Sequence, residues 1–221
     1  MKNHFIPALS TDWLTPFYDR VIETMGWGRA LKRRALEEIH LTAGERLLDI
    51  GCGTGTLLLE AVRETPGAHL TGIDPDPQIL SLAQKKLQAY QIELVQASSE
   101  QLPFPPMSFD VVVSTLVFHH LPMEIKRRAI AEIARVLTAE GRFLLADVGP
   151  ATTLPFKILT AFLLTVATPV AALVQLKEIR YARENMQGVL PLFLKEAGFT
   201  VRDPVPRYRG IHLLLATKNR Q

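Results

Sequence analysis

The sequence predicts an α/β fold with a seven-stranded, mostly parallel sheet, helices on both faces and a C-terminal antiparallel hairpin. Short apolar or β-branched segments alternate with amphipathic helical segments from residue 46 to residue 149, which is the pattern of repeated βαβ units. The last two strand-like segments are separated only by residues 206–210. That connection is too short for a helical crossover, so these two strands must pair antiparallel.

Each element is expected from its own local pattern. The strands, in chain order, are expected at residues 47–50, 70–74, 92–96, 110–114, 141–148, 199–205 and 211–217. Helices are expected where apolar residues recur three and four apart, at residues 11–40, 57–62, 77–90, 124–137 and 189–197. Gly26 and Gly28 interrupt the first helical segment, so residues 29–39 should form a separate helix.

Composition bounds the class of protein. A chain of 221 residues with 48% hydrophobic and 21% charged residues suits one sizeable globular domain. Cys52 is the one cysteine, so neither an internal disulfide nor a Cys/His zinc site is expected, which fits a reducing cytoplasm. The formal net charge is +3. Its basic clusters are either solvated helix faces or sites of attraction to an anionic membrane surface or an acidic ligand, and no nucleic-acid partner is expected.

A glycine-rich turn follows the first expected strand. Its spacing is Gly51-x-Gly53-x-Gly55, which differs from the G-x-G-x-x-G of dinucleotide sites. Glycines in such a turn permit positive φ and let a ligand approach the backbone at a helix N-terminus. Asp74 ends the second strand, where a carboxylate can accept ribose hydroxyls, and Asp49 precedes the loop. A nucleoside ligand is favoured, and a plain structural turn is the alternative.

Several segments resemble one known family. Residues 47–55 (LLDIGCGTG) are similar to motif I of the class I S-adenosylmethionine-dependent methyltransferases, whose fold is Rossmann-like. Further matches follow in the family's order at residues 99–104 (SEQLPF), 109–114 (FDVVVS), 119–122 (HHLP) and 135–142 (RVLTAEGR). Tyr18-Asp19 and the helix after it look like the type 11 branch, which contains ubiquinone and menaquinone C-methyltransferases.

The resemblance implies S-adenosyl-L-methionine as cofactor and S-adenosyl-L-homocysteine as product. It assigns cofactor contacts to Tyr18, Asp49, Gly51, Cys52, Gly53, Thr54, Gly55, Asp74, Pro75, Asp76, Ser98, Ser99, Glu100, Ser114, Thr115 and Leu116. Asp49 would lie near the amino group and Asp74 would bind the ribose. Ser98 stands where the family often has an aspartate against the adenine amino group, and serine accepts that hydrogen bond more weakly.

The catalytic candidates are His119, Tyr18 and Asp19, any of which could act as a base. His119 and His120 follow the fourth strand, where the family's acceptor pocket opens. Two alternatives stay open. The histidine pair can serve packing before Pro122, and many family members need no dedicated catalytic side chain, because alignment of the reactants supplies much of the rate. No metal is expected.

We expect one domain over residues 1–221. Its segments would be an N-terminal helical lid (1–43), the cofactor-binding core (44–149), an apolar helical cap (150–186) and a C-terminal helix and hairpin (187–221). Residues 158–176 carry no charge and are interrupted by Pro169. Two hinged helices are expected there rather than a membrane span, because the strands on either side belong to one sheet.

The cap has three candidate roles: a lid over the acceptor, a homodimer interface, or a peripheral membrane contact through residues 154–183. The function expected overall is methyl transfer to a small, lipophilic acceptor such as a quinone-like ring or a lipid headgroup. The expected location is the cytoplasm, with peripheral contact at the inner face of the membrane as an option. The alternatives are an S-adenosylmethionine-binding module without transferase activity and, disfavoured by the loop spacing, a nicotinamide-dependent oxidoreductase.

Overall fold

The computed structural model describes residues 23, 26–150, 181, 183–202 and 206–219. The helices in this part of the chain are α2 (Arg29–Ile39), α3 (Thr56–Glu64), α4 (Pro77–Leu87), α5 (Met123–Val136) and α8 (Val189–Glu196), with the 3₁₀ helix η3 (Phe118–His120). The strands are β1 (Arg46–Ile50), β2 (His69–Asp74), β3 (Ile92–Gln96), β4 (Phe109–Thr115), β5 (Leu137–Val148), β6 (Phe199–Val201), β7 (Arg207–Tyr208) and β8 (Ile211–Lys218).

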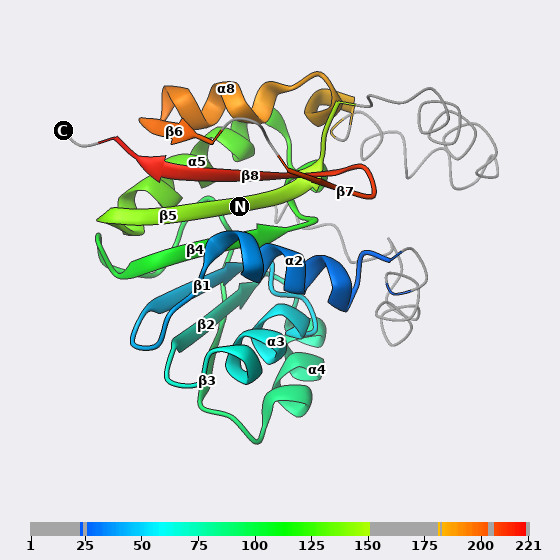
Figure 1. Ribbon diagram of the computed structural model, residues 1–221, viewed down its shortest axis with the longest axis vertical. Coiled ribbons are helices and arrows are strands. Elements are labelled where there is room, and N and C mark those ends of the chain that lie inside the picture. The colour runs from blue at the N-terminus through cyan, green and yellow to red at the C-terminus, as the bar shows by residue number, and fades with distance from the viewer. Residues whose placement is uncertain (1–22, 24–25, 151–180, 182, 203–205, 220–221) are drawn as a thin grey trace.

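The strands form one sheet in the order β3-β2-β1-β4-β5-β8-β6, as Figure 1 shows from one edge to the other. The five strands from β3 to β5 are parallel, while β8 pairs antiparallel with both β5 and β6. The strand order reverses between β1 and β4. In open α/β sheets the carboxyl ends of the strands at such a reversal are where ligands bind.

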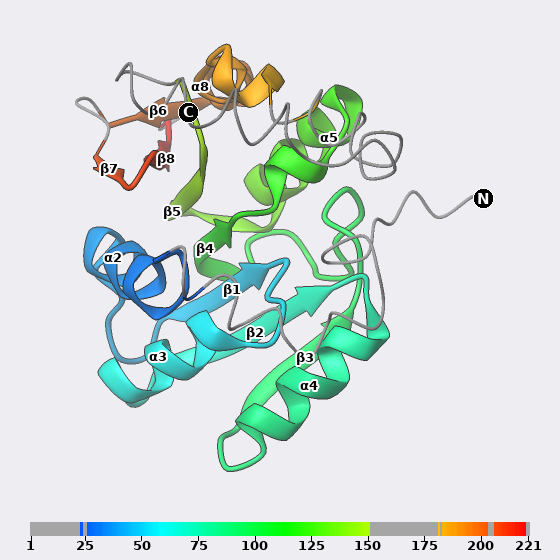
Figure 2. The same ribbon diagram turned by 90° about the vertical axis from the view of Figure 1, so that its right-hand side faces the viewer.

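Two helical layers cover the sheet (Figure 2). Helices α2, α3 and α4 lie on one face, and α5 and α8 lie on the other. Strand β5 contributes side chains to the hydrophobic core on each face of the sheet, because alternate residues of a strand point to opposite faces. Leu144 and Ala146 pack under α2 and α3, while Phe143 and Leu145 pack under α5 and α8. Within the described residues, no helix has the length and apolar character needed to cross a membrane.

The predicted α/β fold with its mostly parallel sheet and antiparallel C-terminal hairpin is confirmed, with three differences in detail. Strand β5 begins at Leu137 rather than at Gly141, through a register irregularity opposite β4. The described part of the expected strand at 199–205 is β6, which ends at Val201. The expected connection at 206–210 itself contributes the two-residue strand β7, which pairs with the start of β8 and makes the strands eight rather than seven.

Several expectations fall outside the described residues. The helix expected before Gly26, with Tyr18 and Asp19, lies there, as does most of the apolar cap, residues 151–180. The division of residues 1–221 into one domain with four segments therefore stays a prediction.

An arginine on β5 ties α2 to the sheet. The Arg142 guanidinium donates to both carboxylate oxygens of Glu45, at 2.6 and 2.8 Å, and to the carbonyl oxygens of Ile39 and His40 at the end of α2. A planar guanidinium suits this fork of acceptors. The contact holds α2 against β4, β5 and β8, and from there Lys32 of α2 reaches Thr115 at the carboxyl edge of the sheet.

Phe143 offers a test of the core between the sheet and the layer of α5 and α8. It is fully buried, and its ring centroid lies 6.4 Å from those of both Phe118 and Phe199. We expect Phe143→Ala to lower the free energy of unfolding by about 3–5 kcal/mol, because a large cavity replaces the ring. Urea denaturation measures this. Leu192→Ala is the matched control, since Leu192 is 58% exposed and its loss should change stability little; equal losses would contradict the assignment of the core.

Candidate functional site

The glycine loop connects β1 to α3 at the carboxyl edge of the sheet. All three alternate glycines have left-handed backbones, with φ of 68° at Gly51, 55° at Gly53 and 77° at Gly55. A Cβ built on Gly51 would lie 2.4 Å from Cγ2 of Val117, whereas one built on Gly53 would meet nothing within 4 Å. Gly51 and Gly55 are therefore required by the packing of the fold itself. The space over Gly53, in contrast, is open to a ligand.

Asp74 fixes this loop from the neighbouring strand. Its carboxylate accepts the backbone N–H of Gly53 through Oδ2 and that of Asp76 through Oδ1, each at 3.0 Å. Asp76 in turn caps α4 by accepting the N–H groups of Gln78 and Ile79. Burial raises the pKa of Asp74 to about 6, against the two backbone hydrogen bonds, which lower it.

Asp49 lies beneath the same loop and is almost completely buried. Its side chain is 1% exposed, and Oδ1 accepts no hydrogen bond from any described residue. Burial raises the pKa of Asp49 to about 7, the charge of Lys32 opposes that rise, and the charge of Asp74 adds to it. A buried carboxylate without donors is costly. Such a group is suited to a ligand that brings positive charge or N–H donors.

The carboxyl end of β4 and the first turn of α2 close the site on the other side. Ser114 Oγ donates to the carbonyl oxygen of Ile50 at 3.1 Å, and Lys32 Nζ donates to Thr115 Oγ1. Leu116 has a left-handed backbone, φ 62°, and its N–H donates to the Ala146 carbonyl oxygen at 2.9 Å. The structure thus brings the expected residues 114–116 next to the glycine loop, together with a lysine from α2 that the sequence did not indicate.

The ends of β2 and β3 form the third side. The Ala97 N–H donates to the Asp74 carbonyl oxygen at 3.3 Å, and Gln96 Nε2 donates to the Pro75 carbonyl oxygen at 3.1 Å. Residues 98–100 follow directly, so they lie at the same edge as Asp74 and Pro75. Ser99 is buried, and the Ser98 carbonyl oxygen accepts the N–H of Gln101.

Two loop side chains are turned into the protein. The Cys52 thiol is buried in the core beneath α3, and burial raises its pKa. Thr54 Oγ1 accepts a hydrogen bond of 2.7 Å from Lys86 Nζ on α4. Cys52 and Thr54 therefore present backbone rather than side chain to the space above the loop.

His119 forms a pair with a residue that the sequence reading missed. Its Nδ1 lies 2.9 Å from Oδ1 of Asp147, at the carboxyl end of β5, and Asp147 is 1% exposed. Asn185 Nδ2 donates to the same Oδ1 at 3.4 Å. Asp147 is the next-to-last residue of the strand expected at 141–148, near the carboxyl edge, so its position along the strand could have indicated it. Asn185 could not have been found, because it comes from a distant segment.

His120 has a different environment from His119. The two rings are in contact, with centroids 3.9 Å apart and their planes tilted by 42°. The Nδ1 atom of His120 is buried without a hydrogen-bond partner among the described residues. Burial and the neighbouring His119 lower the pKa of His120 to about 3, so its ring stays neutral.

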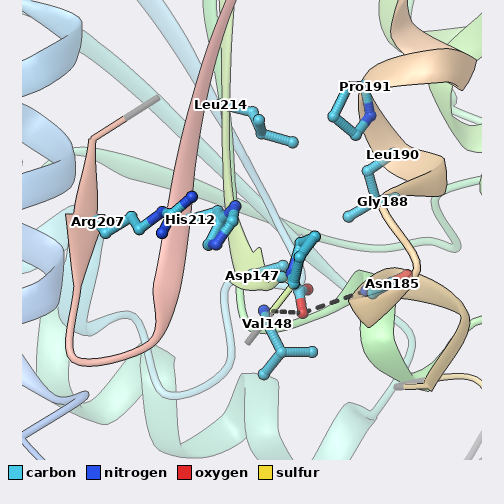
Figure 3. Close-up of a pocket in the computed structure, with 11 residues that line it drawn as sticks. Asp147, Val148, Asn185, Gly188, Leu190, Pro191, Arg207, His212 and Leu214 are labelled. Carbon is cyan, nitrogen blue, oxygen red and sulfur yellow. Dashed lines mark hydrogen bonds between the residues drawn. The ribbon is translucent and has the colours of Figure 1, made fainter. Parts of the chain in front are cut away.

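A cavity of about 610 Å³ opens beside Asp147. Figure 3 shows it between the hairpin, which contributes Arg207 and His212, and the start of α8. Its lining is mostly apolar or glycine, from Val148, Gly149, Pro150, Gly188, Leu190, Pro191 and Leu214, with Asn185 and Asp147 as further polar members. The strand that carries Asp147, β5, lies two strands away from β1 and its glycine loop. At the usual strand spacing this separation is about 10 Å. A mostly apolar cavity with a few polar groups is the usual form of a small-molecule site.

Comparison with known proteins places these features in a family. The methyltransferase domain family matches residues 48–145. A demethylmenaquinone methyltransferase of Thermus thermophilus is 33% identical over 141 residues. The match covers 62% of this chain and 63% of that protein, which is less than two thirds of its length. The uncharacterized methyltransferase YrrT of Bacillus subtilis is 33% identical over 154 residues, covering 66% of this chain and 68% of that protein. A SAM-dependent methyltransferase from Aquifex aeolicus has the same fold, with a TM-score of 0.65 at 17% identity over 85% of this chain and 89% of that one.

The raised pKa of Asp49 predicts an unusual pH dependence of stability. The folded value of about 7 exceeds the unfolded 3.8, so the folded chain binds the proton more tightly and loses stability as pH rises through that window. We expect Asp49→Asn to raise the free energy of unfolding at pH 8 by roughly 1–4 kcal/mol, with no gain below about pH 4, where both states are protonated. Denaturant titrations across this pH range measure it.

Asp110→Asn is the control, because its effect on stability should depend on pH in the opposite direction. Hydrogen bonds from Arg46 hold the pKa of Asp110 below its usual range. That variant should lose stability at neutral pH and match the wild type at low pH. An Asp49→Asn protein that is less stable at pH 8 would contradict the account of Asp49 as an unpaired buried charge.

Proposed function

Because this chain belongs to the S-adenosylmethionine-dependent methyltransferases, we propose that it transfers a methyl group from S-adenosyl-L-methionine to a small, lipophilic acceptor. A quinone-like ring is the acceptor we favour, with a lipid headgroup as the other member of the class. The observation that carries the proposal is the left-handed glycine loop fixed by Asp74, with the unpaired carboxylate of Asp49 beneath it.

The site fits the cofactor in charge and in shape. The open space over Gly53 admits a ligand against the backbone. A ligand with a sulfonium and an ammonium group would compensate the buried carboxylate Oδ1 of Asp49. Asp74 would accept the ribose hydroxyls. Pro75 and Asp76, with residues 98–100, would border the adenine, and residues 114–116 the methionyl end.

The cofactor supplies an electrophilic methyl group when it is bound. The chain's own part is to orient the acceptor and to exclude water, which can account for much of the rate. Where the acceptor must lose a proton, a base helps, and we propose His119 for this role because it lies at the carboxyl edge beside the cavity residue Asp147. Tyr18 and Asp19 stay rival candidates, and both lie outside the described residues, as does the Tyr18 contact with the cofactor.

The cavity beside Asp147 is our proposed acceptor site. Its mostly apolar lining suits a ring or an alkyl group, and the Thermus relative is named a demethylmenaquinone methyltransferase. A lipophilic acceptor is also the reason to propose peripheral contact of residues 154–183 with the cytoplasmic face of a membrane. A homodimer stays an alternative use of the same segment.

The cofactor assignment predicts the effect of Asp74→Asn. We expect the affinity for S-adenosyl-L-homocysteine to fall by tenfold or more, because hydrogen bonds to a charged group contribute about 1.5–3 kcal/mol each. Isothermal titration calorimetry measures it, with Asp110→Asn, a carboxylate at the opposite end of the sheet, as the matched control. NADH should not bind. A wild-type protein with no affinity for S-adenosyl-L-homocysteine would overturn the proposed function.

The acceptor assignment predicts a product and a blocking variant. We expect a lipid extract incubated with deuteromethyl cofactor to yield a labelled lipophilic product by mass spectrometry. Pro191→Phe should raise KM for that acceptor roughly tenfold or more by filling the cavity, with cofactor affinity unchanged. Leu192→Phe is the control on the exposed side of α8. Cofactor binding without label transfer would indicate a binding module instead of a transferase.

A further inference from the structure

We propose that Asp147 is a positioning residue that fixes the His119 ring with Nδ1 protonated, leaving Nε2 as the atom that accepts the acceptor's proton. The inference rests on the proposed methyl transfer. It concerns a residue that neither the sequence motifs nor the glycine loop indicated.

The Asp147 carboxylate is surrounded by donors. Oδ1 accepts the Val148 N–H at 2.7 Å and Asn185 Nδ2 at 3.4 Å, and it lies 2.9 Å from His119 Nδ1, while Oδ2 accepts the His119 N–H at 3.3 Å. Burial alone would raise the pKa of Asp147, but the His119 ring and these hydrogen bonds lower it below the usual range. Asp147 therefore stays an ionised carboxylate although it is 1% exposed.

An ionised carboxylate only accepts hydrogen bonds, so the short contact with His119 requires a proton on Nδ1. A neutral imidazole with a proton on Nδ1 carries its basic lone pair on Nε2. The side chain of His119 is 19% exposed, in contrast to the fully enclosed Asp147. The ring is therefore fixed at one nitrogen while the side chain stays partly exposed, and a general base needs both a fixed orientation and access to its substrate.

Contacts connect this pair to both parts of the proposed site. Val117, two residues before His119, packs against Gly51 so closely that a Cβ there would lie 2.4 Å from it. On the other side, Asp147 itself lines the cavity. The pair thus lies between the loop proposed for the cofactor and the cavity proposed for the acceptor.

The titratable groups on neighbouring elements leave the pair intact. His212 lies opposite Asp147 across β5 and β8, and burial and the charge of Arg207 lower its pKa. His120 contacts the His119 ring and is neutral, with a pKa lowered to about 3 by burial. Lys126 of α5 is buried and donates to Glu184 at 3.3 Å and to the Tyr181 carbonyl oxygen at 3.0 Å. Lys126 and Glu184 therefore compensate each other, and Asp147 is the anion that touches the His119 ring.

The step balances without any further reactant. The acceptor atom bonds to the methyl carbon while the carbon–sulfur bond of the sulfonium breaks, and its electron pair stays on sulfur as the thioether forms. The proton that the acceptor loses passes to His119 Nε2. The resulting imidazolium is stabilised by the adjacent carboxylate of Asp147, and the proton then leaves to solvent.

The first test reads the ring directly and needs no substrate. Two-dimensional ¹H–¹⁵N spectra of the histidine side chains report which nitrogen carries the proton, and His119→Gln identifies the His119 signals among the six histidines. We expect neutral His119 in the wild type to be protonated at Nδ1. Asp147→Asn should lower that fraction, and Asp110→Asn should leave it unchanged. A wild-type ring protonated at Nε2 overturns the proposal.

The second test is kinetic, with an anaerobically reduced 2-alkyl-1,4-naphthohydroquinone as the probe. We expect Asp147→Asn to lower kcat by about 10²-fold or more with both KM values unchanged, and to shift the acid limb of the kcat profile to lower pH. Asp147→Glu should restore the acid limb. The fall in kcat should be smaller for hydroxylated probes that are more acidic, because they lose their proton more readily without a base. An Asp147→Asn enzyme with wild-type kcat and acid limb overturns the proposal.

The two tests separate the failure of this inference from failure of the proposed function. If wild-type protein methylates neither the probe nor a lipid extract, the function is wrong, whereas the ring spectra still decide what Asp147 does to His119. A purely structural Asp147 would lower the melting temperature and S-adenosyl-L-homocysteine affinity of Asp147→Asn while leaving the acid limb in place. Asp110→Asn, measured alongside, gives the effect of losing a carboxylate elsewhere.

Discussion

The contact on which the site depends is that between the Asp74 carboxylate and the backbone N–H of Gly53. It joins the end of β2 to the loop after β1, and the same side chain accepts the N–H of Asp76 at the start of α4. One carboxylate therefore sets the course of two strand–helix connections. The left-handed backbone of the three glycines is what lets the loop approach that carboxylate.

Two buried aspartates at this edge show how environment separates residues of one type. Asp49 and Asp147 are each 1% exposed. Asp49 Oδ1 has no hydrogen-bond partner among the described residues, and its pKa rises, whereas Asp147 accepts from three backbone or side-chain donors besides the His119 ring contact, and its pKa falls. The first is incomplete without a ligand, and the second is already complete within the protein. The difference is the physical basis for giving them separate roles.

Local pattern was enough to predict most of the fold. The alternation of apolar segments placed β1 to β5, and the short connection after residue 205 predicted the antiparallel hairpin, because both are properties of neighbouring residues. The glycine spacing and Asp74 likewise indicated the loop. Lys32, Asp147 and Asn185 were missed because their contacts join distant segments, as when Lys32 reaches Thr115 from α2. Strand β7 was missed because two residues are too few to show the alternation of apolar and polar side chains that indicates a strand.

The unpaired carboxylate of Asp49 also links ligand binding to proton release. A carboxyl with a pKa of about 7 is partly protonated in the free protein at neutral pH. A cationic ligand beside it favours the ionised form, so each binding event would expel a fraction of a proton. Affinity for the cation would then climb as solutions become more alkaline, and the heat of binding would depend on the ionisation enthalpy of the buffer.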